Sequence, residues 1–542
     1  CNNGGSLASI NSTEGVLYAE IAALADDSTN RLISLSDGTS SNRVSLFYGN
    51  ENLNQIKLVI FSGGVLTTNI SFISNDITET SKIAAKFSEN NFALWVNGLE
   101  VATDTSGASP IGLNTLEFNI AGIAPFYGKT KALAVWKEAL SDAELADLTY
   151  PTPTDPTFSL DFDTIATDFT FARGSEATYV DAQGLIQSTA SNNAPRLDYS
   201  TGAEAFLLEP QSTNLIQYSE DFSNAYWVKS AAFITSNSTI SPDGSLNASL
   251  LKGDGLGSFP RIQTTVSGSG QISFSVFVKK ELSDNVTIYI SGTGIGGGAE
   301  ASSVYKYTFS TDSFLITSGG TVNSSVSTSF GNDWVRLTLN YTTTTITGVR
   351  IYPKYASTST DGVYIYGAQV EQQTYATSYI PTSGSSVTRN QETCINATPE
   401  INSEEGVLYV EINAENVYSN SRYIALSDGT TSNRVIIGVS SNAAGTITCF
   451  VSSGGSTVAI LSSTADITDF NKVALRYSEN NFSLFLNGVK VSTDTSGLAP
   501  VGLNRLTYGN GVPNATPFYG STKDIQVYTK ALSDAELIKL TT

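Results

Sequence analysis

The run EGVLYAEI at residues 14–21 decides the fold, because it returns as EGVLYVEI at residues 405–412. Other runs repeat in the same order: LSDGTSSNRV becomes LSDGTTSNRV, SENNFALWVNG becomes SENNFSLFLNG, and TDTSG, PFYG and ALSDAEL each occur twice. A repeat of this length indicates duplicated domains rather than a solenoid of short units. We assign the copies to residues 1–150 and 394–542. A different module occupies residues 158–393, and YPTPTDPT around 151–157 is a stiff linker.

Local patterns predict an all-β chain. VLYAEI, KIAAKFS and FALWVNG alternate apolar and polar residues with period two, which is typical of half-buried antiparallel strands. Asn97-Gly98 and Asn487-Gly488 each predict a tight hairpin turn. Ser141 with Glu144, and Ser533 with Glu536, form capping boxes that begin a helix. We expect a three-module string of antiparallel β-sandwiches (jelly rolls), with each terminal module ending in one short helix.

Composition excludes several classes of function. The formal charge is −21, whereas nucleic acids and anionic lipids need clustered Lys and Arg. We therefore expect no nucleic-acid and no membrane partner, and no stretch approaches the roughly 20 apolar residues of a membrane span. The chain has no His, which removes Ser-His-Asp triads and imidazole metal sites. Any metal would be a hard cation such as calcium, held by oxygen atoms.

The three cysteines are too few for a disulfide framework. Cys449 stands where the first copy has Leu58, so we expect it to fill the core. Cys1 is open to two interpretations. It could be a lipoprotein anchor, or an ordinary residue of the lead-in strand, as its counterpart Cys394 suggests.

The repeated module resembles the laminin-G / concanavalin A-like lectin superfamily. LSDGTSSNRV, the SENNF hairpin and the helix after PFYG carry this resemblance over both copies. It implies a jelly roll of two antiparallel sheets. Because that fold hosts lectins, adhesion modules, hydrolases and structural domains, the resemblance does not fix a function.

The central module is similar to a segment of tailed-bacteriophage tail fibres, tail spikes and head fibres. Four runs carry the similarity in order: FTFARGSEATYVDAQGLI, NNAPRLDY, LLEPQSTNLIQYSEDFSNAYWVKS and VYIYGAQVEQQTYATSYIPTSGSSVTR. The similarity implies a carbohydrate-binding-module-like jelly roll over about residues 210–385. Related modules hold a structural calcium between an early acid and an Asp of the final strand. Here Glu220 and Asp221 could be the early acids, but the final strand reads Tyr364-Ile365-Tyr366-Gly367, which puts that site in doubt.

Sugar binding needs an aromatic face for the C–H side of a pyranose and polar groups for its hydroxyls. The candidate glycan-binding residues are Tyr226, Trp227, Trp334, Tyr352, Tyr355, Tyr364 and Tyr366. Large aromatics also dominate sandwich cores, so Trp227 and Trp334 fit a core equally well. Tyr364 and Tyr366 share one strand face. That face is a sugar platform if it is exposed and core if it is covered.

Several polar residues recur in the two copies, and they have two interpretations. Asp37, Asn42 and Asp104 return as Asp428, Asn433 and Asp494. Asp and Asn bond their own backbone in tight turns, which accounts for the recurrence. Calcium ligation at the rim is the alternative.

The sequence as a whole predicts a non-enzymatic fragment of a bacteriophage tail fibre that binds host cell-surface polysaccharide. Its partners would include other virion proteins and further copies of itself, and it would lie on the virion surface. Three alternatives stay open: a head fibre or capsid decoration protein, a capsule or lipopolysaccharide depolymerase, and a bacterial surface adhesin. A depolymerase would need two suitably spaced carboxylates, and no pair stands out among the 50 acidic residues.

Overall fold

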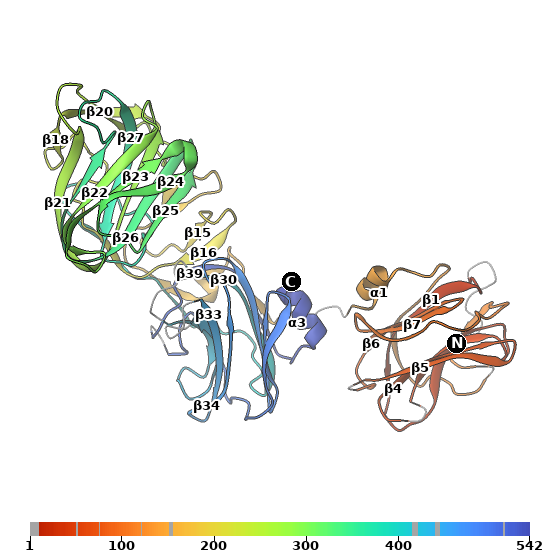
Figure 1. Ribbon diagram of the computed structural model, residues 1–542. Coiled ribbons are helices and arrows are strands. Elements are labelled where there is room, and N and C mark those ends of the chain that lie inside the picture. Colours follow the sequence, from red (N-terminus) through yellow and green to blue (C-terminus); the bar gives the residue numbers. More distant parts are fainter. Residues whose placement is uncertain are drawn as a thin grey trace. The chain divides into compact units, whose positions relative to one another are not determined.

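A computed structural model of the chain describes residues 10–49, 52–74, 76–120, 122–150, 155–414, 421–439, 445–512 and 515–542. Within these residues the architecture is antiparallel β, with three short α-helices, which confirms the predicted all-β class. The chain divides into two compact units, formed mainly by residues 1–154 and 155–532 (Figure 1). Most of the predicted linker, and Cys1, fall outside the described residues.

The N-terminal copy is a sandwich of two five-stranded sheets. The first has the order β10-β1-β6-β7-β8, and the second has the order β5-β4-β3-β2-β9. Side chains from both sheets meet in one core that includes Leu17, Ile33 and Ile83. The elements are β1 (Glu14–Ala23), β2 (Arg31–Ser36), β3 (Arg43–Tyr48), β4 (Gln55–Ser62), β5 (Val65–Ile73), β6 (Ser81–Ser88), β7 (Asn91–Val96), β8 (Leu99–Asp104), β9 (Thr115–Glu117), β10 (Gly128–Trp136) and α1 (Asp142–Thr149).

The C-terminal copy repeats this topology strand for strand. Its sheets contain β39-β30-β35-β36-β37 and β34-β33-β32-β31-β38, so the duplication inferred from the sequence holds at the level of strand order. Cys449 is fully buried in its core. The elements are β29 (Thr393–Ile395), β30 (Glu405–Asn413), β31 (Arg422–Ser427), β32 (Arg434–Val439), β33 (Thr446–Ser453), β34 (Ser456–Thr464), β35 (Asn471–Ser478), β36 (Phe482–Leu486), β37 (Val489–Asp494), β38 (Arg505–Thr507), β39 (Gly520–Tyr528) and α3 (Asp534–Thr541).

The predicted turns and caps are present in both copies. Asn97 and Gly98 have φ values of 49° and 86°, and Asn487 and Gly488 have 48° and 80°. Positive φ at both central residues is what a type I′ hairpin requires. The Ser141 hydroxyl accepts from the Glu144 amide while the Glu144 carboxylate accepts from the Ser141 amide, and Ser533 and Glu536 bond in the same way.

The central module is a jelly roll built around two very long strands, β21 and β26. Its main sheet path runs β19-β20-β27-β21-β26-β22-β23-β24, with β18 paired to β21 and β25 paired to β26. The elements are β17 (Ser212–Asn214), β18 (Val228–Ser230), β19 (Ala232–Thr239), β20 (Ala248–Gly253), β21 (Arg261–Lys280), β22 (Asn285–Ile295), β23 (Glu300–Thr308), η1 (Phe309–Thr311), β24 (Ser313–Gly319), β25 (Ser324–Phe330), β26 (Trp334–Tyr352), β27 (Gly362–Glu371) and β28 (Val387–Arg389).

The segment before this jelly roll packs on the C-terminal sandwich. β11 and β16 both pair with β39, so one sheet crosses the boundary we predicted between residues 393 and 394. Phe169, Phe206 and Leu208 are buried in the core of the C-terminal copy. The elements of this segment are β11 (Phe158–Ser159), α2 (Ile165–Asp168), β12 (Thr170–Ala172), β13 (Thr178–Val180), β14 (Ile186–Ser188), β15 (Arg196–Asp198) and β16 (Ala205–Leu208).

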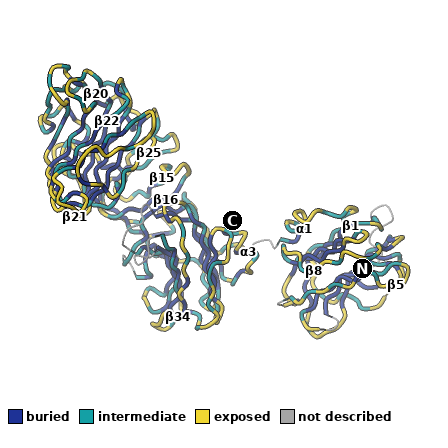
Figure 2. The backbone as a smooth tube through the Cα atoms, in the orientation of Figure 1, coloured by how far each residue is buried: buried dark blue, intermediate teal, exposed yellow. Residues whose placement is uncertain are grey.

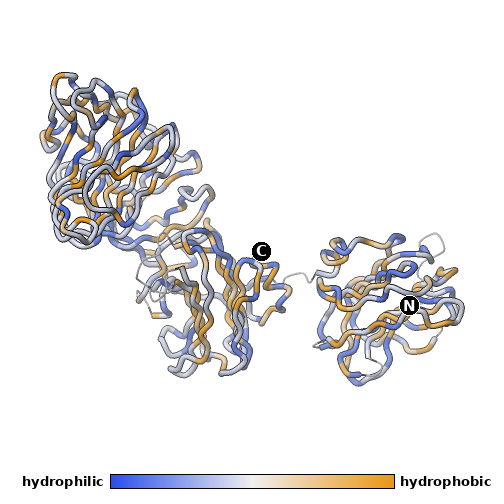
Figure 3. The backbone as a smooth tube through the Cα atoms, in the orientation of Figure 1, coloured by the Kyte–Doolittle hydropathy of each residue, from blue (hydrophilic) through white to orange (hydrophobic). Residues whose placement is uncertain are grey.

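Burial is nearly continuous along the inner strands: β1, β2 and β7 are buried at almost every position, on both faces of the sheet. Buried backbone runs through the middle of each sandwich and exposed residues gather in the connecting loops (Figure 2). Apolar and polar residues alternate along the same strands (Figure 3). In the described part of the chain, no helix has the length and apolar character that crossing a membrane requires.

Candidate functional site

A pocket of about 470 Å³ opens between the central jelly roll and the segment that precedes it. Its walls come from β13, β15 and β16 on one side, from β25 and β26 on the other, and from the loop at 374–379. Asn413 and Thr468 of the C-terminal sandwich also line it. Ligand pockets usually measure roughly 300–1,000 Å³, so this one has the size of a small-molecule or oligosaccharide site.

Strand alternation on β26 explains the polar wall. Leu337, Leu339 and Tyr341 point into the jelly-roll core. The intervening residues Arg336 and Asn340 point to the opposite face, as strand geometry requires, and line the pocket. β25 lies beside β26 in the same sheet and extends this face, with Ser324 paired to Asn340.

Asn340 carries a buried acceptor that faces this pocket. Its side-chain nitrogen donates to Ser324 Oγ at 2.9 Å. Asn340 is only 6% exposed, and its Oδ1 is buried. This oxygen accepts no hydrogen bond from the described part of the chain. An unpaired buried acceptor is costly unless water or a ligand supplies a donor.

Aromatic side chains form a second wall. Phe330 and Tyr179 are half-buried and line the pocket, and Phe277 and Tyr379 are buried there. The Phe330 and Phe277 rings meet edge to face with centroids 4.9 Å apart. The pocket thus combines apolar faces with hydrogen-bonding groups, the combination that orients a sugar ring.

Two carboxylates line the pocket, and both already bond to other groups of the protein. Asp198 accepts from the backbone amides of Val180 and Ser200 at 2.8 Å each. Burial alone would raise the pKa of Glu209, but Arg389 and Arg196 outweigh it and lower that pKa to about 2. A carboxyl group with this pKa stays ionised at neutral pH and is a poor proton donor.

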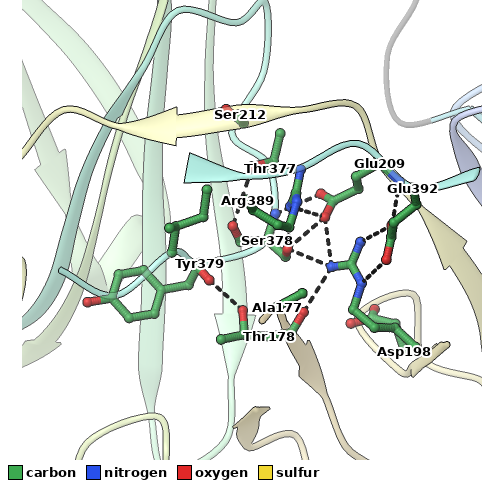
Figure 4. Close-up of polar contacts among 12 residues, drawn as sticks. Ala177, Thr178, Asp198, Glu209, Ser212, Thr377, Ser378, Tyr379, Arg389 and Glu392 are labelled. Atoms are coloured by element: carbon green, nitrogen blue, oxygen red, sulfur yellow. Dashed lines mark hydrogen bonds and ion pairs between the residues drawn. The ribbon is translucent and has the colours of Figure 1, made fainter. Parts of the chain in front are cut away.

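A buried ion cluster fixes the inner end of the pocket (Figure 4). Arg196 bonds Glu392 at 2.5 Å and Glu209 at 2.8 Å, and the side chains of all three are at most 1% exposed. Arg389 bonds Glu209 as well, and Arg173 bonds Glu392 at 2.8 Å. Ser378 donates to Glu209 at 2.6 Å and accepts from Arg389. Because Glu209 and Ser378 also line the pocket, the cluster holds its wall in place.

The four runs that carry the similarity of the central module meet in this cluster. Arg173 comes from FTFARGSEATYV, Arg196 from NNAPRLDY, Glu209 from LLEPQSTNL and Arg389 from the last run. Each charge is buried and needs a partner. Arg196 and Arg389 pair with Glu209 of a third run, and Arg173 pairs with Glu392, three residues after the last run. The structure therefore gives a physical reason why these four runs occur together.

The structure separates the predicted glycan-binding aromatics. Trp227 and Trp334 are fully buried, and their indole N–H groups donate to the carbonyls of Tyr218 and Ile240. Tyr352 and Tyr366 are also buried. These four residues were candidates for glycan binding. The structure places them in the core, which corrects that prediction.

Tyr364 is half-buried against the same cluster as Tyr366, so the shared face of their strand is covered and does not form a sugar platform. Tyr226 is half-buried and contacts Tyr218 and Trp227. Tyr355 is 45% exposed and is the most accessible of the candidates. None of the seven lines the pocket described above.

Sequence reasoning missed Arg336, Asn340 and Phe330. The available signal was the alternation in WVRLTLNY, residues 334–341, which predicts one polar face. That pattern could not indicate that a distant segment, residues 178–209, closes over the polar face to make a pocket.

The predicted calcium ligands are engaged in turns. Asp37 accepts from the amide and hydroxyl of Thr39 and from the Asn42 side chain, and Asp428 has the same partners in Thr430 and Asn433. Asp104 and Asp494 accept from the serine two residues later, Ser106 and Ser496. Nowhere in the described ranges do three His, Cys, Asp or Glu residues gather as a metal site. These residues do not fit a calcium ion, which prefers six to eight oxygens.

The acids considered for a central calcium are engaged as well. Glu220 Oε1 accepts from the hydroxyls of Tyr366 at 3.1 Å and Tyr379 at 3.0 Å. Asp221 accepts from the amide and hydroxyl of Ser223. Tyr366, which stands in the final strand where related modules have a carboxylate, thus bonds the early acid directly.

Comparison with known proteins identifies part of the chain. Residues 401–538 match the family model described as the concanavalin A-like lectin/glucanases superfamily. The C-terminal copy is therefore a lectin-like sandwich, as the sequence predicted. No curated protein matches the chain.

Several solved structures are similar to the chain at low scores. The carbohydrate-binding module of the Ruminococcus gnavus IT-sialidase is 23% identical, with a TM-score of 0.23, over 26% of this chain and 84% of its own. The mouse laminin α1 domains LG4-5 are 6% identical, with a TM-score of 0.20, over 98% and 88%. The NanB sialidase of Streptococcus pneumoniae is 12% identical, with a TM-score of 0.23, over 97% and 96%. The scores are low, and we take nothing further from these likenesses.

Proposed function

We propose that this chain is a non-enzymatic receptor-binding part of a bacteriophage tail fibre, and that it binds host-surface glycan in the pocket around Asn340. The observation that carries the glycan proposal is a pocket lined by Asn340, with its buried, unpaired Oδ1, and, at the other end of the β25–β26 pairing, by the half-buried Phe330 ring. An oligosaccharide that extends along the pocket offers hydroxyl groups to the first and an apolar C–H face to the second.

The tail-fibre setting is supported by the four runs of the central module and by the lectin-like sandwich at residues 401–538. In this setting the chain lies on the virion surface beside other virion proteins. Many copies on one particle would make a weak site sufficient, because avidity multiplies modest affinities.

The absence of catalysis is also part of the proposal. General acid catalysis of glycoside cleavage needs a carboxyl group whose pKa lies near the working pH. In the pocket, Arg389 and Arg196 hold the pKa of Glu209 low, and Asp198 is bonded to two backbone amides. These contacts support a binding site more than a cleaving one.

Binding can be tested on an array of bacterial capsular and lipopolysaccharide fragments. Asn340→Ala should weaken binding of the glycan that the intact chain selects by about 1–3 kcal/mol, the usual cost of a lost hydrogen bond to a buried partner. Tyr355→Ala is the matched control, because Tyr355 is an exposed aromatic outside the pocket. If Tyr355→Ala abolishes binding and Asn340→Ala does not, the glycan site lies at the tip of the jelly roll and the pocket assignment is wrong.

Cleavage is tested by counting reducing ends while the chain is incubated with that glycan. The proposal predicts no increase over time. A steady increase that stops when Asp198 is changed to Asn would instead establish a depolymerase.

A further inference from the structure

The two lectin-like copies differ in what covers one edge of their sandwich. In the C-terminal copy, β39 is bordered on its outer side by β11 and β16. Phe158 pairs with Val527, and Leu208 pairs with Gly520. In the N-terminal copy the equivalent strand, β10, ends its sheet and has no outer partner among residues 10–150 that the structure describes.

The apolar surface next to this edge differs in the same way. In the C-terminal copy, Leu506, Tyr508, Phe518, Ile525 and Val527 are all at most 1% exposed. Phe169 and Phe206 each pack on the Tyr508 ring with centroids 5.6 Å apart. The matching residues of the N-terminal copy are apolar too but only half-buried: Leu116, Phe118, Phe126, Leu133 and Val135.

We propose that β10 and these five residues, together called the β10 edge, form a docking site for a polypeptide module of the same kind as residues 155–393. The incoming module would add an antiparallel strand to β10, as β16 does to β39, and would cover Phe118 and Phe126 with apolar side chains. Strand addition of this kind satisfies backbone groups at an open sheet edge while side-chain pockets give specificity.

One residue tunes the affinity of this edge. Ser521 pairs with Leu207 and is buried, whereas its counterpart Lys129 is exposed. A lysine on an edge strand opposes indiscriminate pairing, since docking would partly desolvate its charge. The β10 edge should therefore bind more weakly than the edge of β39, and a smaller neutral residue should strengthen it.

Three fragments test the proposal. Residues 1–154 contain a complete sandwich core, and residues 155–393 contain the separate jelly-roll core together with the freed donor segment. The core of residues 394–542 is completed by Phe169, Phe206 and Leu208 of that donor segment. In titration calorimetry, fragment 155–393 should bind 394–542, which serves as the positive control, and should also bind 1–154. Phe126→Ser should weaken the second interaction at least tenfold, and Lys129→Ser should tighten it several-fold.

Leu99→Ser is the matched control, because Leu99 is 62% exposed on β8 at the opposite end of the sheet and should not affect binding. If 155–393 binds 394–542 but neither 1–154 nor its Lys129→Ser variant, the proposal is overturned. If the freed donor segment binds neither sandwich, a fusion of 155–393 to residues 1–154 tests whether the segment docks on β10 when both are in one chain. Slow hydrogen exchange at Gly128–Thr130 in that fusion supports docking, and exchange as fast as in 1–154 alone contradicts it.

Discussion

Arg173, Arg196, Arg389, Glu209 and Glu392 share one buried site, where each charge depends on the others. Removing one member leaves an uncompensated charge in the interior, which costs about 3–5 kcal/mol. Arg196→Met should therefore destabilise residues 155–542 by about that amount in urea unfolding. Lys280→Met removes a solvent-exposed pair with Asp284 and should cost at most about 1 kcal/mol. Equal effects of the two substitutions would mean that the cluster is not stabilising.

The same cluster predicts a pH dependence. Burial raises the pKa of Glu209, but the charges of Arg389 and Arg196 outweigh it and bring the pKa to about 2 in the folded chain, against about 4.3 when unfolded. A depressed carboxyl pKa contributes stability above the unfolded value, and that stability is lost as pH falls toward the folded value. The free energy of unfolding should fall between about pH 4.3 and pH 2. In Glu209→Gln, the drop over that window should be smaller, which urea unfolding at several pH values would measure.

The sequence showed some of these residues but not their role. Arg173, Arg196, Glu209 and Arg389 lie within the four runs that carried the similarity to fibre proteins. Up to 219 positions separate the members of a bonded pair, such as Arg173 and Glu392. Spacing along a chain cannot indicate which distant charges meet, so the cluster required the fold.

At the level of elements, the two helix caps form a matched pair. Ser141 and Ser533 begin α1 and α3 with the same reciprocal bonds to Glu144 and Glu536. Replacing an N-cap serine by alanine typically costs about 1 kcal/mol. Ser141→Ala and Ser533→Ala should each cost about that much, as measured by calorimetry of fragments 1–154 and 155–542. A substantially larger loss in one fragment would show that the two helices are not equivalent.

Turn chemistry at Asp37 and Asp428 gives a second element-level prediction. Their carboxylates already accept from Thr39 or Thr430 and from Asn42 or Asn433. Saturating calcium should leave the melting temperature of fragment 1–154 unchanged, because these carboxylates bind no ion. An ion that bound only the folded state would raise the melting temperature. A rise that disappears in Asp37→Ala would contradict the turn interpretation and establish a calcium site.

Elements were predictable where their signals are local. Alternation, Asn-Gly pairs and capping boxes gave the strands, hairpins and helices of both sandwiches. The addition of β16 to β39 was not predictable, because a strand of residues 205–208 can pair with any open edge of suitable register. The role of Trp227 and Trp334 stayed open for a related reason: they look the same in sequence whether they line a core or a ligand site, and the structure places both in the core.

For the whole molecule, glycan binding in the pocket predicts that the ligand stabilises only one of the two compact units. The pocket lies entirely within residues 155–532, and residues 1–154 form a separate compact unit. A glycan at 100 times its Kd should stabilise the unit that binds it by about 2.7 kcal/mol. Scanning calorimetry of fragments 1–154 and 155–542 should show a higher melting temperature only for 155–542. A shift confined to 1–154 would place the site in the N-terminal sandwich.

The most direct test of the account is hydrogen–deuterium exchange of the intact chain with and without the array-selected glycan. We expect slower exchange at β25, at the Arg336–Asn340 part of β26 and in the 374–379 loop, which line the pocket. The loop that carries Tyr355 and the N-terminal sandwich should be unchanged, and in the C-terminal sandwich only the surroundings of Asn413 and Thr468, which line the pocket, should change. Protection confined to the Tyr355 loop or to a terminal sandwich, with none around Asn340, would contradict the account.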